Sequence, residues 1–205
     1  ASLGVGLPAS STLQIRGGRF ESAGTFNRTL GTGIGEVNWS DGLDGGGGGF
    51  SALGGDLTLN FAGNQSQIEW AVGGFVPDGA TLHLGSDDSD AKLTFINPIN
   101  LGSTGSHQRE IRVTNNGSTK DDLAEFTGNL SHGGGIQGID KLGEGRLRLT
   151  GNNTYNGATT IDGGHLQADD GVGLPSVSLL RIRGGVLETN GIFDRSIGQV
   201  AGQVN

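Results

Sequence analysis

Residues 4–21 read GVGLPASSTLQIRGGRFE, and residues 171–188 read GVGLPSVSLLRIRGGVLE. The two stretches align without a gap at one constant offset, which also pairs Arg28 with Arg195 and Asn38 with Asn205. A long-period repeat is the signature of architectures that stack similar units, so it limits the choice of fold before any other feature. We therefore expect one full repeat followed by the start of the next, as in a window on a longer array.

The composition favours a protein made of short strands. The chain has 205 residues, of which 42 are Gly, 17% are charged and 33% are hydrophobic. Glycine is about three times as frequent as in an average protein. Apolar residues recur two apart, as in Leu57/Leu59 and Leu147/Leu149, and glycine pairs such as Gly54-Gly55 stand between such runs. This spacing predicts strands joined by glycine turns, and no stretch shows the 3.6-residue period of a helix.

Two all-β architectures fit these strands, a sandwich or barrel and a solenoid. The repeat favours the solenoid, since each coil contacts only its neighbours and no linker separates the two copies. At roughly 20–25 residues per coil, we expect about eight to ten coils. We divide this one continuous body into the end of a preceding repeat (1–39), spacer coils (40–144), and a β-strand repeat motif with the start of the next copy (145–205).

Charge and cysteine content exclude several classes of function. The chain has no Cys, which excludes disulfides, thiolate nucleophiles and cysteine zinc sites. Its net charge is −8, which argues against nucleic acid and anionic membrane surfaces as partners. No apolar run approaches membrane-spanning length. We expect no cofactor, because no phosphate-binding or dinucleotide-binding loop is present.

Candidate catalytic and metal residues are few. Asp87, Asp88 and Asp90 form the one acidic stretch that could bind Ca²⁺, but it lacks the EF-hand spacing, so a solvated turn is favoured. The remaining acids are scattered and Lys is scarce, which argues against a polysaccharide-degrading enzyme. An adhesin that contacts sugars or proteins through the loops 41–49 and 103–108 is an alternative. Trp39 and Trp70 lie in strand-like patterns and are expected in the core rather than against a sugar.

Residues 145–188 carry a denser pattern that begins G-x-L-x-L-T-G-x-N-T-Y-x-G-x-T-T-I. The segment resembles the autotransporter-associated β-strand repeat, also called the passenger-associated transport repeat. The positions that match the family pattern are Gly145, Leu147, Leu149, Thr150, Gly151, Asn153, Thr154, Tyr155, Gly157, Thr159, Thr160, Ile161, Gly164, Leu166, Leu174, Pro175, Gly184, Gly185 and Glu188.

The resemblance implies a right-handed parallel β-helix in a large, repetitive bacterial protein that is secreted or displayed on the cell surface through an outer-membrane translocator. We expect a non-enzymatic, structural segment that does not itself contact the membrane. The expected partners are neighbouring repeats, with head-to-tail self-association, and a surface glycan or protein ligand.

The residue types of the same segment predict a stacked wall. Thr159, Thr160 and Ile161 are β-branched residues that suit a pleated sheet, and asparagines around Tyr155 suit a corner between strands. We expect an inward-facing column of seven apolar side chains, which are Leu147, Leu149, Ile161, Leu166, Leu180, Ile182 and Leu187.

Overall fold

The computed structural model describes residues 7–39, 47–119 and 123–205 and is built almost entirely of strands. The one helical element in these residues is the short 3₁₀ turn η1 (Phe61–Gly63), and no described helix is long and apolar enough to span a membrane. The strands are β1 (Leu13–Ile15), β2 (Arg19–Phe26), β3 (Val37–Trp39), β4 (Gly48–Leu59), β5 (Ile68–Glu69), β6 (Leu82–Leu84), β7 (Leu93–Phe95), β8 (Ile99–Asn100), β9 (Ser106–Val113), β10 (Leu123–Phe126), β11 (Leu130–Ser131), β12 (Ile136–Leu142), β13 (Arg146–Leu149), β14 (Thr159–Ile161), β15 (His165–Ala168), β16 (Leu180–Ile182) and β17 (Val186–Glu188).

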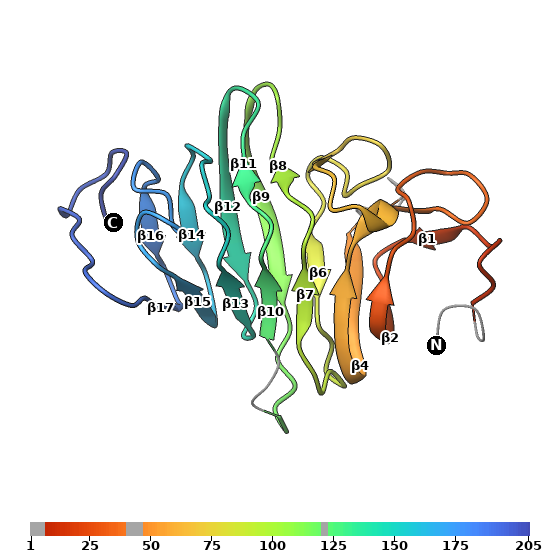
Figure 1. Ribbon diagram of the computed structural model, residues 1–205. Helices are drawn as coiled ribbons and strands as arrows, with labels where there is room; N and C mark the ends of the chain where they lie inside the picture. The colour runs from red at the N-terminus through yellow and green to blue at the C-terminus, as the bar shows by residue number, and fades with distance from the viewer. Residues whose placement is uncertain (1–6, 40–46, 120–122) are drawn as a thin grey trace.

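The large sheet is parallel and has two arms that meet in β4. Residues 48–50 of β4 pair with β6, and residues 57–59 pair with β7. One arm continues through β9, β12, β14 and β16, and the other through β10, β13, β15 and β17. Successive strands of the chain therefore fall on different arms, as they do when a chain winds into a solenoid. Figure 1 shows the strands side by side from the N-terminal end to the C-terminal end.

A separate, shorter sheet lies beside the two arms of the large sheet. It contains β5, β8 and β11 in parallel, and these strands follow β4, β7 and β10 along the chain. The path from one arm to the next through this sheet closes the solenoid into a barrel-like cross-section. The prediction of an all-β solenoid is confirmed at this level.

The core consists of rows of apolar side chains that repeat from coil to coil. Because side chains alternate across a strand, every second residue of each short strand faces inward. One row consists of Phe26, Leu59, Phe95, Phe126, Leu149 and Ala168, each at most 2% exposed. Trp39 and Trp70 are buried as expected, and Trp39 packs edge-on against Phe50 and Phe75. The aromatic residues fill the wider half of the solenoid.

The coils shorten along the chain. The path along the chain from Leu59 to its partner Phe95 is nearly twice as long as the path from Leu149 to its partner Ala168. The predicted number of eight to ten coils, which assumed one narrow range of coil length throughout, is not confirmed. Long loops in the first half take up the additional residues.

Two local expectations need correction. Gly54-Gly55 was expected to be a turn between strands, but β4 continues through both residues, which adopt positive φ angles of 76° and 143°. In the expected inward column, Leu147, Leu149, Ile161, Leu166 and Leu180 are buried, as predicted. Ile182 is 42% exposed and Leu187 is only partly buried, because only the short run 203–205 lies beside the outer edge of β16 and no described strand pairs with the outer edge of β17.

Candidate functional site

Residues 145–161, the first part of the dense motif, form β13, the corner after it, and β14. β13 and β15 pair in parallel and direct Leu147, Leu149 and Leu166 into the core. β14 pairs with β12 on one side and with β16 on the other. Its three β-branched residues are all buried, and strands of the neighbouring coils pair with both of its edges.

Asn153 joins three successive coils at the corner after β13. Its Oδ1 accepts the Leu130 N–H at 2.7 Å, and its Nδ2 donates to the Gly173 carbonyl oxygen at 2.7 Å. The side chain is 4% exposed, so both bonds replace hydrogen bonds to water. Asn97 is a buried amide that instead joins two coils, since it accepts from the Phe61 N–H and donates to the Phe61 carbonyl oxygen. The corner therefore depends on an amide that donates to one neighbour and accepts from the other.

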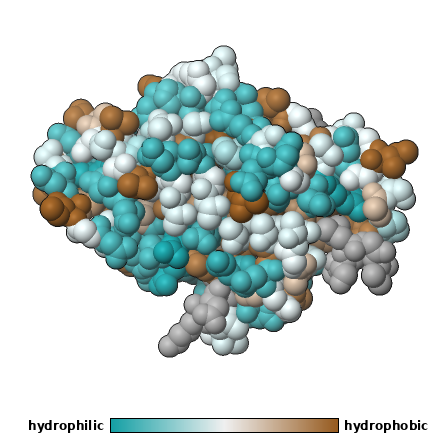
Figure 2. All heavy atoms as spheres, in the orientation of Figure 1, coloured by the Kyte–Doolittle hydropathy of each residue, from teal (hydrophilic) through white to brown (hydrophobic). Residues whose placement is uncertain are grey.

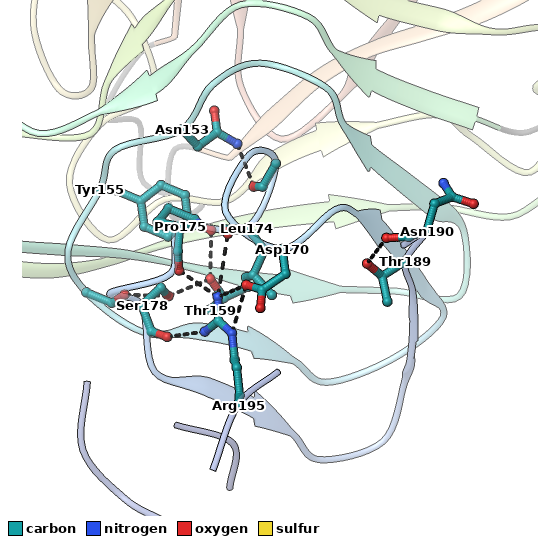
Figure 3. A network of polar contacts seen from close by, with 12 residues as sticks. Asn153, Tyr155, Thr159, Asp170, Leu174, Pro175, Ser178, Thr189, Asn190 and Arg195 are labelled. Atoms are coloured by element: carbon teal, nitrogen blue, oxygen red, sulfur yellow. Dashed lines mark hydrogen bonds and ion pairs between the residues drawn. The ribbon is translucent and has the colours of Figure 1, made fainter. Parts of the chain in front are cut away.

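A chain of buried hydroxyls lies inside this corner (Figure 3). The Tyr155 hydroxyl lies 2.6 Å from Thr159 Oγ1, which lies 2.8 Å from Ser178 Oγ. Ser178 donates its one hydroxyl proton to the Gly157 carbonyl oxygen, so it accepts from Thr159, which in turn accepts from Tyr155. All three side chains are fully buried. Burial raises the pKa of the Tyr155 hydroxyl above its usual range, so it remains a neutral donor.

Arg195 closes the turn at residues 174–178. Its guanidinium donates to the carbonyl oxygens of Pro175 at 2.8 Å and Ser178 at 2.5 Å, and it forms an ion pair with Asp170. Arg28 makes the same bonds in the first copy, to Pro8 at 2.8 Å and to Ser11. We call this unit the arginine-capped turn, meaning residues 174–178 with Arg195 and residues 7–11 with Arg28.

The two copies of the repeat share further backbone contacts. Leu13 pairs with Val37 in the first copy, and Leu180 pairs with Val204 in the second. The matching hydrogen bonds Leu13 N–H to Glu36 O and Leu180 N–H to Gln203 O both measure 2.9 Å. Repeated sequence thus produces repeated structure at the same constant offset.

A comparison with known protein families found a match to the dense motif. Residues 139–168 match the family model of the passenger-associated-transport-repeat. Residues 139–168 are thus similar to a passenger-associated-transport-repeat. Such repeats are associated with the passenger domains of autotransporter-like proteins, which are secreted or attached to the cell surface. Searches of curated proteins and of solved structures found no match.

The segment that matches this repeat requires glycine in this chain where coils come closest. A Cβ on Gly157 would lie 2.5 Å from the Gln137 carbonyl carbon of the previous coil. Gly164 has a φ of +59°, and a Cβ there would lie 2.6 Å from the Glu144 backbone. Both motif positions therefore exclude any side chain. The matched segment ends at residue 168, and the predicted motif positions from Leu174 to Glu188 lie on the next coil.

The candidate calcium ligands do not come together. Asp90 Oδ1 accepts the Gly54 N–H at 2.7 Å, whereas the Asp88 N–H donates to Ser86 in an exposed turn that also holds Asp87. Across the described residues, no three His, Asp or Glu side chains form a group that could hold a metal ion. Of the two loops named as adhesin candidates, residues 41–46 lie outside the described residues.

An outer groove of about 520 Å³ lies on the surface of the described residues. Its walls consist of Asp56, Asp90, Ala91, Lys92, Leu123, Arg146, Arg148 and Gln167. Both acids are engaged by backbone N–H groups, Asp90 by Gly54 and Asp56 by Lys92. Lys92 and Arg148 both pair with Glu125, at 3.4 and 3.6 Å. The groove carries charges of both signs beside one another.

Lys141 is a core residue that the sequence analysis did not predict. It occupies an inward position of β12, between Ile111 and Ile161 in neighbouring strands. Its Nζ donates to the carbonyl oxygens of Leu142, Gly143 and Gly163 at 3.1, 2.7 and 3.0 Å. Burial lowers the pKa of Lys141 to about 8, an effect that nearby Glu144 opposes and Arg112 strengthens. The alternation Ile139-Asp140-Lys141 was the available signal, since it places Lys on the apolar side of its strand.

Proposed function

We propose that this chain is a non-enzymatic structural segment, part of the stalk or filament of a large repetitive bacterial surface or secreted protein. The observation that carries the proposal is the structural repeat, in which the arginine-capped turns at Arg28 and Arg195 form the same hydrogen bonds. A unit that recurs with its contacts can be added many times without a linker. The passenger-associated-transport-repeat supports export to the cell surface.

The proposed mechanism is mechanical. Buried apolar rows and parallel strand pairing join each coil to the next, so a pull at one end is resisted by every level. The coil is right-handed in this proposal, as the family resemblance implies. The neighbouring repeats of the same protein are its partners, and separate chains associate head to tail.

Surface display tests this function. A row of paired residues runs from Gly48 through Leu82, Ile111, Lys141 and Ile161 to Ile182. Ile15, the counterpart of Ile182, lies against Gly48, so one unit advances by six strand spacings, about 29 Å at ~4.8 Å each. An epitope carried by one, two or three repeat units on an outer-membrane anchor should move outward by about 29 Å per unit. A height that does not change with unit number would refute the stalk.

A carbohydrate-binding surface module is the second candidate, and the groove beside Arg146 and Arg148 favours it. A ligand with carboxylate groups would have to displace Glu125 from Arg148 and Lys92. Arg148→Gln should then abolish retention on immobilised acidic polysaccharide, while Arg183→Gln on the neighbouring arm should not. Turnover of such a polymer that is lost in Asp56→Asn or Asp90→Asn would instead indicate a polysaccharide-degrading enzyme.

A further inference from the structure

The structure contains the same surface twice, once covered and once open. Phe26 is fully buried, whereas its counterpart Phe193 is 36% exposed. Ile15 is 4% exposed and its counterpart Ile182 is 42% exposed. Ile197 is 92% exposed, whereas its counterpart Leu30 packs against the core. Figure 2 shows hydrophobic side chains on the surface at the end that holds the C-terminus.

The segment that covers the first copy is the coil built on β4. Phe26 pairs with Leu59 and lies 4.7 Å from Phe50 and 5.9 Å from Phe61 between ring centroids. Ile15 lies so close to Gly48 that a Cβ on this glycine would approach Ile15 Cγ2 to 2.7 Å. The covering coil therefore combines glycine at one contact with aromatic and leucine side chains at the next.

The backbone hydrogen bonds show the same difference between the covered first copy and the open second copy. The Phe26 and Arg28 carbonyl oxygens accept the N–H groups of Asn60 and Ala62, at 2.9 and 3.2 Å. Their counterparts on Phe193 and Arg195 accept no hydrogen bond from any described residue. The pairing also determines strand length. Residues 19–26 form one strand against β4, whereas of their counterparts 186–193 only Val186–Glu188 form a strand, and that strand pairs with β15.

We propose that the face formed by residues 180–205 binds a parallel coil with the sequence of residues 47–61, carried by the following repeat of the same polymer. This inference rests on the proposed function, since it names the partner that each repeat requires. A separate second copy fits this face less well. Its own β4 coil is already occupied by its β2, so it can present only the outer edge of β2.

The test compares the original chain with a longer chain that carries a second copy of its own covering coil at the C-terminus. Asn205 is the counterpart of Asn38, so residues 39–81 are appended directly after Asn205. Amide hydrogen exchange is then compared between the extended and the original chain, at a concentration where the original chain is monomeric. Residues 186–197 should exchange at least tenfold more slowly in the extended chain. The matched control carries Phe50→Asp and Phe61→Asp in the appended run alone and should show no added protection.

Two hydrogen-exchange results would overturn the proposal. One is equal exchange of residues 186–197 in the extended and original chains, and the other is equal protection by the intact and the doubly substituted runs. Persistent self-association of the extended chain would assign the face to a second copy and would equally overturn it. Hydrogen exchange does not depend on surface display. If exchange slows in the extended chain but the epitope height does not change with unit number, this proposal holds and the proposed stalk function fails.

Discussion

Lys141 is a charged group held in an apolar row, so its protonation affects folding. Because its pKa falls from 10.5 to about 8 on folding, the unfolded chain binds more protons between these values. Its contribution to stability is therefore lowest below pH 8 and rises with pH up to about 10.5. The unfolding free energy of the native chain should rise relative to Lys141→Met by up to about 1.4 kcal/mol per pH unit in this window.

Urea unfolding of both proteins at pH 7, 8, 9 and 10 measures this difference. The comparison cancels the titration of every other group that the two chains share. Lys92→Met is the control for the loss of a lysine charge at the surface, since the Lys92 side chain is 40% exposed. A difference between the native chain and Lys141→Met that stays flat or falls from pH 8 to 10 would contradict the buried ammonium.

Substitution of Asn153 tests how much this single side chain stabilises the corner after β13. Replacement by Ala leaves the Leu130 N–H and the Gly173 carbonyl oxygen buried without a partner. We expect Asn153→Ala to lower the unfolding free energy by about 2–5 kcal/mol. The adjacent Asn152 is exposed, so Asn152→Ala should change it by less than about 0.5 kcal/mol. Equal losses from the two variants would rule out the bridging role of Asn153.

The strand is the element that carries the core, and its two faces should respond differently to truncation. Leu149 in β13 pairs with Phe126 and Ala168 and is 2% exposed. Leu149→Ala should cost about 2–5 kcal/mol, because the surrounding coils cannot collapse into the cavity. Arg148 in the same strand faces outward and pairs with Glu125, so Arg148→Ala should cost less than about 1 kcal/mol. Thermal and urea unfolding of the two variants measure the contrast.

The alternation of apolar residues predicted the elements well where coils are short. In β13 and β15 every second residue is apolar and buried, so sequence and structure agree. The prediction of a turn at Gly54-Gly55 was wrong, because β4 continues through both glycines. The arginine-capped turns were missed, since a guanidinium that binds carbonyl oxygens far away in the sequence leaves no local pattern. The number of coils could not be predicted either, because the loops of the spacer coils vary in length.

At the scale of the whole molecule, the C-terminal end of the described residues is strongly apolar, with Ile182, Phe193 and Ile197 exposed. Without the next coil, we expect separate chains to associate through it with the outer edge of β2 in another chain. Such a head-to-tail contact uses different surfaces on the two partners and need not close. Sedimentation velocity should therefore show a mean size that grows with concentration.

Charge placed on this end should weaken the contact. Phe193→Asp combined with Ile197→Asp should raise the concentration needed for association at least about tenfold, since two carboxylates would lose water in the interface. Val72→Asp is the matched control, because Val72 is also exposed, at 53%, but lies in the loop between β5 and β6. The head-to-tail model requires that only the first variant responds. A chain that stays monomeric at every concentration, or that loses association equally with Val72→Asp, would show that this end does not recognise another copy.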